Sequence, residues 1–424
     1  MRLQLLTRSG PPDFLDLPWE RSLEQWQSDR LVEATSGIGR HVVRFVDYDG
    51  AIFALKELPD RLAEREYRLL RELEERSMPV VQLVGVVTER GTNADGDALD
   101  AILITRFLDF SLPYRLLFTG RGVPDLRNRL LDALADLLVR LHLAGFFWGD
   151  CSLSNTLFRR DAGALAAYVV DTETGELHPQ LSDGQRTFDL EIAEENFAGE
   201  LLDLIAAEGD AAERLADLDA FALAAQVRPR YERLWAELTG DDVFRPDERY
   251  RLDARLKRLN DLGFDVDEIE LVTTDGGFRL RLPTRVVEPG HHRRRLYALT
   301  GILAGENQAR RLLNDLWGYK ADLERRTGHP VLEAVGASRW RIESFEAALA
   351  AIPAELRGKL EPAELYHEIL DHRWYASEAA GRDIGLADAV RSYVDQVLSQ
   401  VADEPAIGIG RGTRPGGVTR ARRP

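Results

Sequence analysis

The chain has 424 residues, of which 30% are charged and 44% hydrophobic, and its formal net charge is −17 at pH 7. This acidic balance argues against a protein that coats nucleic acid or anionic membranes, and the sequence makes no strong case for nucleic-acid binding. A single cysteine, Cys151, excludes an intramolecular disulfide, which fits a reducing compartment. We find no signal-peptide pattern and no apolar run near the roughly 20 residues of a membrane helix. We therefore expect a cytoplasmic protein without a membrane span.

Hydrophobic patterning and turn residues divide the chain into four parts. Residues 1–30 form a polar, Trp-containing lead-in, and residues 31–238 form a first domain. A turn at 239–242 and Pro246 mark a boundary, and a second domain covers 246–402. The tail, 404–424, is rich in Gly, Pro and Arg with almost no apolar residues, so we expect it to be disordered.

The first domain is predicted to begin as a sheet and to continue as helices. Its expected elements are strands at 40–46 and 52–56 around an Asp49-Gly50 turn, a helix over 60–76, strands at 80–88 and 101–107, a helix over 126–141 ended by Gly145, strands at 156–158 and 166–170 around a turn at 161–163, and helices from about 190 to 238. In the second domain we expect a helix over 252–262, a hairpin formed by 269–272 and 278–282, and about three further helices.

One loop and the strand after it carry the residue types that phosphoryl transfer requires. Asp150 and Asn155 lie five apart on the predicted loop, and Asp171 closes the apolar strand at 166–170. Transfer from Mg-ATP needs one carboxylate facing the acceptor hydroxyl, and an amide and a second carboxylate that hold the metal. The spacing therefore indicates a phosphotransferase loop.

Residues upstream of this loop supply groups that could bind nucleotide phosphates. Lys56 ends a predicted strand and could reach phosphates if a helix carboxylate fixed it. Glu66 falls on the apolar face of the 60–76 helix, where an unpaired acid would be costly, so we expect it to pair with Lys56. Glu64 lies on the solvated face. Gly37 and Gly39, before the first strand, would let backbone N–H groups approach phosphates, although Gly-x-Gly is common in turns.

With these motifs the chain resembles the protein-kinase-like superfamily over about residues 30–235, most closely its bacterial lipopolysaccharide-kinase-like and aminoglycoside-phosphotransferase-like branches. The resemblance implies an α+β fold: a bilobal kinase-like domain that uses ATP and Mg²⁺, followed by a mostly helical accessory domain with a small β-hairpin. By this resemblance Gly37 and Gly39 cover the phosphates, Lys56 and Glu66 form the phosphate-positioning pair, Thr105 and Phe107 lie in the adenine hinge at 104–108, Asp150 is the catalytic aspartate, and Asn155 and Asp171 hold the metal.

The chain departs from the kinase pattern in three places. Trp148 stands where typical kinases have His, Thr172-Glu173 replace Phe-Gly, and no Ala-Pro-Glu element follows. The missing Ala-Pro-Glu element argues against a peptide kinase. We predict phosphoryl transfer to a hydroxyl of a sugar, a lipid-linked sugar or a small molecule. The alternative is a nucleotide-binding pseudokinase that acts as a regulatory module with an anionic partner. His142 is expected to brace the loop, and Cys151 to be a packing residue.

The second domain resembles an uncharacterised bacterial domain that accompanies such kinase-like domains. Its Glu364-x-x-His367 spacing has the form of a carboxylate-bridged metal site, but a second copy is missing, so we favour a solvated amphipathic helix. Residues 279–311 contain eight arginines and two glutamates. The run Arg293–Arg295 could bind an anionic partner or clamp the acidic first domain, and the sequence leaves both open.

Overall fold

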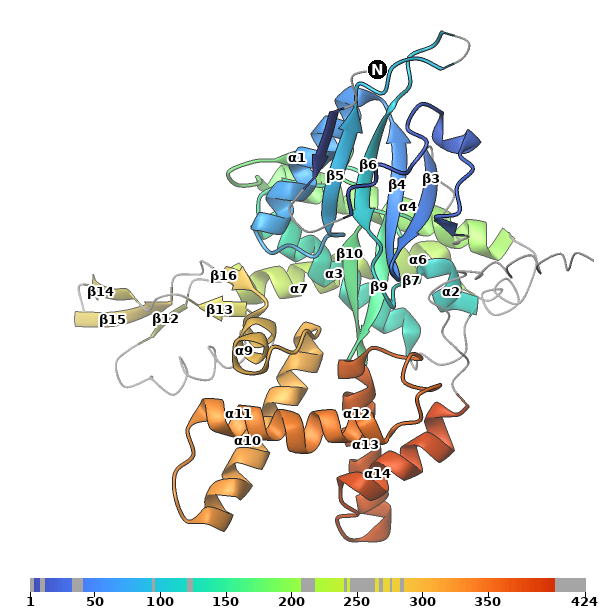
Figure 1. The fold of residues 1–424 in the computed structure, drawn as a ribbon. Helices are drawn as coiled ribbons and strands as arrows, with labels where there is room; N and C mark the ends of the chain where they lie inside the picture. The colour runs from blue at the N-terminus through green and yellow to red at the C-terminus, as the bar shows by residue number, and fades with distance from the viewer. Residues whose placement is uncertain are drawn as a thin grey trace, which may run out of the picture. The chain divides into compact units, whose positions relative to one another are not determined.

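The computed structural model describes residues 4–7, 12–32, 41–93, 96–119, 125–206, 218–239, 242–244, 264–266, 270–274, 277–282 and 286–400. The helix expected over 252–262 and the tail expected at 404–424 lie outside the described residues. The described chain divides into two compact units, one formed by residues 1–68 and 81–109 and the other by 69–80 and 110–404 (Figure 1). None of the described helices combines the length and the hydrophobicity needed to cross a bilayer.

The first unit is built on a six-stranded antiparallel sheet with the strand order β1-β5-β6-β4-β3-β2. Its strands are β1 (Gln4–Thr7), β2 (Leu31–Val32), β3 (Val42–Tyr48), β4 (Ala51–Leu58), β5 (Leu83–Thr88) and β6 (Ala101–Arg106). The predicted Asp49-Gly50 turn joins β3 to β4, and both turn residues have the positive φ angles that a tight hairpin requires. Helix α1 (Asp60–Glu75) follows β4 directly, as predicted.

Residues 1–30 were expected to form a lead-in, but side chains of the described residues 12–30 are packed into the core of the first unit. Phe14, Trp19 and Trp26 are buried in one cluster with side chains from β3 to β6. The fully buried guanidinium of Arg90 donates to the carbonyl of Trp19 at 3.1 Å and pairs with Glu57 at 2.5 Å. A buried cation is stable only when it is paired and hydrogen-bonded, and here it ties the segment to the strand that carries Lys56.

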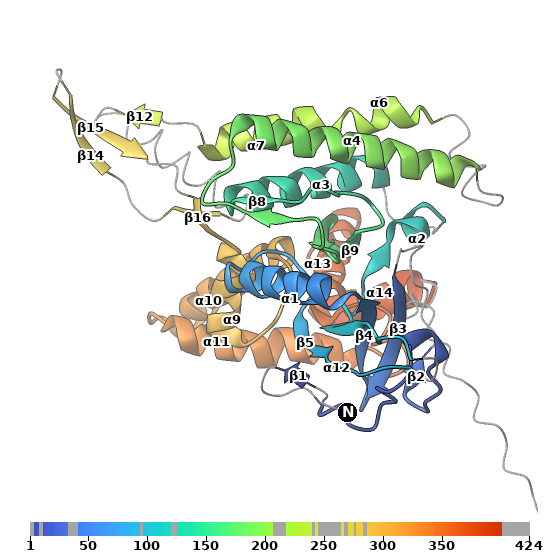
Figure 2. The same ribbon diagram turned by 90° about the horizontal axis from the view of Figure 1, so that it is seen from above.

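The second unit begins with a helical layer and a small sheet. Its elements are β7 (Leu112–Pro113), α2 (Tyr114–Thr119), α3 (Leu126–Leu143), β8 (Phe146–Phe147), β9 (Thr156–Asp161), β10 (Ala164–Val169), β11 (Glu176–Leu177), α4 (Asp183–Ala206), α6 (Ala220–Ala224) and α7 (Val227–Thr239). Figure 2 shows α3, α4 and α7 running alongside one another. The apolar stripe predicted for 126–141 is buried along α3, and β10 places alternate side chains, Leu165, Ala167 and Val169, in the core.

The rest of the second unit is a small β region followed by a helical cluster. The elements are β12 (Asp242–Phe244), β13 (Phe264–Val266), β14 (Glu270–Thr274), β15 (Gly277–Leu282), β16 (Val286–Pro289), α9 (His291–Thr300), α10 (Glu306–Thr327), α11 (Glu333–Trp340), α12 (Ala347–Ala351), α13 (Pro362–Ala380) and α14 (Leu386–Tyr393), with π-helical turns at Arg341–Glu346 and Val394–Leu398. Strands β14 and β15 form the predicted hairpin.

The helical cluster contains more helices than the three or so that we predicted. Gly301, Gly328 and Gly381 follow α9, α10 and α13 with positive φ angles, the backbone conformation that ends a helix at glycine. The helices surround a core centred on the buried rings of Trp340 and Tyr366. The predicted α+β architecture, a sheet-rich first part followed by a mostly helical one with a small hairpin, is confirmed.

Candidate active site

The predicted catalytic loop lies between β8 and β9, and its acidic residue is held by two amides. Asp150 Oδ2 accepts a hydrogen bond from Asn155 Nδ2 at 3.2 Å, and Asp150 Oδ1 accepts one from Asn196 Nδ2, also at 3.2 Å. Asn155 Nδ2 additionally donates to the carbonyl of Asp150 at 3.1 Å. The carboxylate is half-buried. Both amides act as neutral donors, so they fix the orientation of the carboxylate without supplying a counter-charge.

Helix α4 holds this loop at successive turns. Asp189 accepts hydrogen bonds from the backbone N–H groups of Trp148 and Gly149, both at 2.8 Å. Seven residues on, Asn196 donates to the carbonyl of Cys151 at 3.1 Å. Four further on, Glu200 accepts from the N–H groups of residues 153 and 154 at 2.6 and 2.9 Å. Burial raises the pKa of Glu200.

Sequence analysis missed these three residues, although the sequence contains the signal. Asp189, Asn196 and Glu200 recur at i, i+7 and i+11 and therefore lie on one face of α4. Leu190, Phe197 and Leu201 occupy neighbouring buried positions of the same helix. Polar side chains at helical spacing beside an apolar stripe indicate that each has a hydrogen-bond partner inside the protein. Glu66 was paired with Lys56 by the same reasoning.

His142 braces the loop through Asp189, as predicted. Its Nε2 lies 3.0 Å from Asp189 Oδ2, and its Nδ1 lies 2.8 Å from the hydroxyl of Tyr231 on α7. All three side chains are buried. Burial raises the pKa of Tyr231, which keeps the phenol neutral. The series of hydrogen bonds from Tyr231 through His142 to Asp189 therefore ends on the backbone N–H of Trp148, at the start of the Asp150 loop.

Trp148 links the loop to the strand that leads to Asp171. Its indole Nε1 donates to the carbonyl of Asp171 at 2.9 Å, and its own carbonyl accepts from Thr174 Oγ1 at 2.9 Å. The ring is fully buried. The indole thus supplies one N–H donor and a large packing surface at the position where typical kinases have His.

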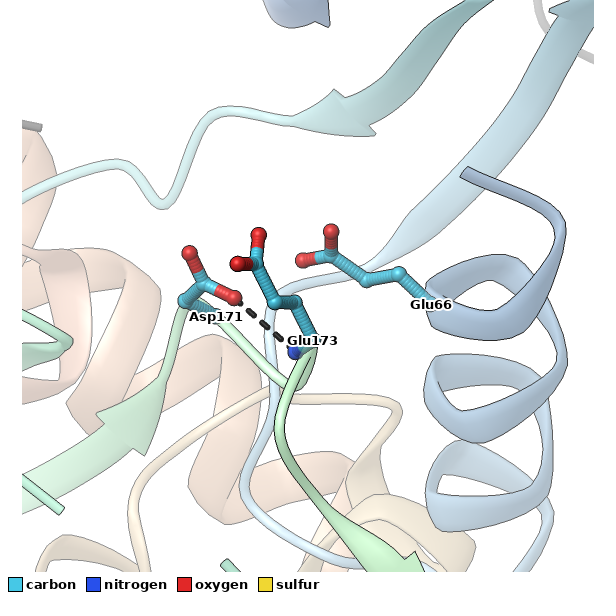
Figure 3. A group of neighbouring side chains, drawn as sticks. All are labelled: Glu66, Asp171 and Glu173. Carbon is cyan, nitrogen blue, oxygen red and sulfur yellow. Dashed lines mark hydrogen bonds between the residues drawn. The ribbon is translucent and has the colours of Figure 1, made fainter. Parts of the chain in front are cut away.

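Asp171 and Asn155 offer oxygen atoms of the kind that Mg²⁺ prefers. Asp171 Oδ1 accepts the backbone N–H of Glu173 at 3.0 Å, as Figure 3 shows. Asn155 uses its Nδ2 toward Asp150, and no described residue donates to its Oδ1. Val170 N donates to the carbonyl of Asn155 at 3.0 Å, so the two segments that carry these residues are adjacent. A carboxylate and an amide oxygen are hard ligands, of the type that Mg²⁺ takes in proteins.

The remaining predicted nucleotide-site residues belong to the first unit. Lys56 Nζ on β4 lies 3.0 Å from Oε2 of the fully buried Glu66 on α1, whereas Glu64 is exposed. Thr105 lies on β6 opposite residue 54, and the N–H of Phe107 donates to the carbonyl of residue 52 at 2.9 Å. Gly37 and Gly39 lie outside the described residues.

Cys151 is a packing residue, as expected. The side chain is buried, and burial raises the pKa of the thiol well above its usual range. A thiol held in its protonated form is a poor nucleophile.

The predicted solvated helix in the second domain is wrong. Glu364 and His367, which we assigned to a solvated helix face, are both buried on α13. Glu364 Oε2 accepts hydrogen bonds from Gln308 Nε2 at 2.7 Å and from the backbone N–H of Ala162 at 2.9 Å. The missing second Glu-x-x-His copy did not bear on burial: the five successive residues 363–367 of α13 are all buried, so other parts of the chain surround this stretch of the helix.

The arginine run Arg293–Arg295 lies in α9, with its members in different surroundings. The N–H of Arg293 donates to Glu306 at 3.3 Å, and its side chain lines a cavity of about 880 Å³ together with residues of α3, β10 and α7. Arg295 lies 3.5 Å from Glu333, and its guanidinium lies over the ring of Trp317 at 5.3 Å. The run is thus divided between the cavity wall and the accessory domain itself.

Comparison with protein families assigns the two halves of the chain separately. Residues 52–202 match the lipopolysaccharide kinase (Kdo/WaaP) family. Residues 233–398 match a domain of unknown function, DUF4032. These matches confirm the predicted likeness to lipopolysaccharide kinases and the predicted fusion to an uncharacterised domain. The kinase-like match contains Lys56, Glu66, Asp150, Asn155 and Asp171.

Solved structures similar to the chain include one described as WaaP in complex with acyl carrier protein. The sequences are 19% identical, the alignment covers 48% of this chain and 89% of that one, and the TM-score is 0.31. A comparison with curated proteins finds no match.

Proposed function

We propose that the chain is an ATP- and Mg²⁺-dependent phosphotransferase that acts on a hydroxyl of a sugar, a lipid-linked sugar or a small molecule. The observation that carries the proposal is the loop of Asp150. Its carboxylate is oriented by two amides, and the loop backbone is held by three side chains of α4. Phosphoryl transfer depends on such positioning, because the protein mainly has to orient the reactants and neutralise the charge on the phosphates.

In this proposal each polar residue has one role. Asp150 accepts a hydrogen bond from the acceptor hydroxyl and orients it for in-line attack. Asn155 and Asp171 would hold Mg²⁺, which neutralises charge on the phosphates. Lys56, kept in place by Glu66, contacts the α- and β-phosphates, and Thr105 and Phe107 contact the adenine.

The family match supports an acceptor that contains a sugar. The matched family is named for lipopolysaccharide, a sugar-containing molecule, and the chain lacks the Ala-Pro-Glu element of peptide kinases. A pseudokinase with the same fold would bind the nucleotide and transfer nothing. Because the residues proposed for both orientation and metal binding are present, we favour the enzyme.

The test combines melting with transfer. Mg-ATP at 100 times its Kd should stabilise the wild-type protein by about 2.7 kcal/mol, since it binds the folded state alone. Asp171→Ala should lose the metal-dependent part of the shift, whereas Asp388→Ala, at an exposed carboxylate of α14, should keep it. Asp150→Asn should keep the shift and lose transfer of labelled phosphate to sugar acceptors. A wild-type protein that melts at the same temperature with and without Mg-ATP would contradict the proposal, and one that shifts but transfers to no acceptor would favour the pseudokinase.

A further inference from the structure

Hydrogen bonds to helices α10 and α13 of the accessory domain, residues 246–402, hold the turn between β9 and β10. The carboxylate of Asp161 is 3% exposed, and it takes the place of a capping side chain for α10. Its Oδ1 accepts the N–H of Gln308 at 2.8 Å, and its Oδ2 accepts the N–H and Nδ2 of Asn307 at 3.0 and 3.2 Å. The first N–H groups of a helix have no partner within the helix, so a carboxylate that reaches them is stabilising.

Gly305 makes this approach possible. It is the residue before α10, and a Cβ at this position would lie 2.3 Å from Asp161 Oδ1. Any larger residue at this position would therefore displace the carboxylate. Gly318, in the middle of the same helix, has open space around its own Cβ position.

A second set of contacts holds the turn from α13. Glu364 Oε2 accepts the N–H of Ala162 at 2.9 Å and the Nε2 of Gln308 at 2.7 Å, and the same Nε2 donates to the carbonyl of Arg160 at 3.1 Å. Beside them Arg159 pairs with Glu361 at 2.6 Å. The turn residue Ala162 has a positive φ angle, so its backbone conformation is fixed by these contacts and by the tight hairpin.

The opposite end of the same hairpin carries the residues proposed to hold the metal. Strand β9 begins at Thr156, directly after Asn155, and β10 ends at Val169, two residues before Asp171. The ladder between the two ends is continuous, with Thr156 opposite Val169 and Asp161 opposite residue 164. Six residue pairs, separated by five steps of about 3.3 Å, place the two ends of the ladder roughly 16 Å apart. At the end near Asn155, β9 also pairs with β7 through Leu157 and Phe158.

We propose that the accessory domain positions Asn155 and Asp171 through its hydrogen bonds to the turn at Asp161. In this arrangement Asp161, Gln308 and Glu364 are positioning residues: they contact neither nucleotide nor metal and act through the β9–β10 ladder. Toward the turn, residues 159–161 and 164–166 form a two-stranded segment beyond the pairing with β7. Two strands are marginal by themselves, so fixing this end reduces fraying and twisting along the ladder. The inference rests on the proposed metal-binding role of Asn155 and Asp171, and it gives the domain of unknown function a task in the reaction.

The experiment weakens the hydrogen bonds between Asp161 and α10 and leaves Asn155 and Asp171 unchanged. Gly305→Ala in the full chain inserts a methyl group at the Asp161 carboxylate, Asp161→Ala removes the carboxylate, and Gly318→Ala is the matched control on α10. Binding of Mn²⁺ is measured by electron paramagnetic resonance with a non-hydrolysable ATP analogue present. We expect Gly305→Ala and Asp161→Ala to raise the Kd for Mn²⁺ about tenfold, within the usual range of coupling between sites. Gly318→Ala should bind Mn²⁺ like the wild-type protein.

Faster hydrogen exchange at the amides of Asn307 and Gln308 shows that their hydrogen bonds to Asp161 are broken in a variant. If those amides exchange faster and the Kd for Mn²⁺ stays within twofold of wild type, the positioning role is refuted. A wild-type protein that binds no Mn²⁺ with the analogue would instead refute the proposed function itself. Recovery of the wild-type signal at excess Mn²⁺ would support positioning, because a misfolded site would not refill.

Discussion

Replacing Asp189 by Asn tests whether α4 holds the Asp150 loop. The side chain is fully buried and receives three donors: the N–H groups of Trp148 and Gly149 at 2.8 Å each and His142 Nε2 at 3.0 Å. An amide offers one oxygen in place of two, so at least one backbone N–H then faces another donor. A hydrogen bond to a charged acceptor contributes about 1.5–3 kcal/mol, and an orphaned buried N–H adds to its loss, so we expect a cost of about 3 kcal/mol.

Two measurements check this value. A loss of about 3 kcal/mol corresponds to a fall in melting temperature of roughly 6–12 °C for a domain of this size. Amide exchange at Trp148 and Gly149 should become faster by about 100-fold, since each 1.4 kcal/mol is a factor of ten. Glu195→Gln, at an exposed position of the same helix, serves as the control and should stay within about 0.5 kcal/mol of wild type. Asp189→Asn and Glu195→Gln variants with equal melting temperatures and equal exchange would refute the reasoning.

Two further predictions concern other carboxylates. Glu66→Gln should lower phosphoryl transfer by at least about tenfold, whereas Glu64→Gln should change it less than about twofold. The reason is that only Glu66 is buried, with its Oε2 3.0 Å from Lys56 Nζ. Equal losses in a transfer assay would show that the wrong glutamate was chosen. Burial raises the pKa of Asp161 from 3.8 to about 6, so the folded protein keeps a proton that the unfolded chain has lost, and the stability contributed by this group falls as pH rises from about 4 to 6. Denaturant unfolding at pH 4.5 and pH 7 should therefore show Asp161→Asn gaining on wild type by about 2 kcal/mol at the higher pH, and a pH-independent difference would contradict the assignment.

The sequence by itself determined the elements whose pattern is local. The Asp49-Gly50 turn, the apolar stripe of α3 and the glycine that ends it were readable because turn geometry and helical periodicity depend on neighbouring residues. Glu66 was identified in the same way, because an acid on an apolar helix face needs a fixed partner. The spacing of Asp150 and Asn155 indicated phosphoryl transfer because both residues lie on one short loop.

Only the tertiary structure decided which distant residues meet. Asp189, Asn196 and Glu200 lie 40 to 47 positions from the loop residues that they hold, and Asp161 meets α10 across 146 positions. The buried state of Glu364 was missed for the same reason: whether a polar face is solvated depends on what packs against it. A sequence pattern records the spacing along one element, whereas a buried carboxylate is stabilised by donors that another part of the chain brings to it.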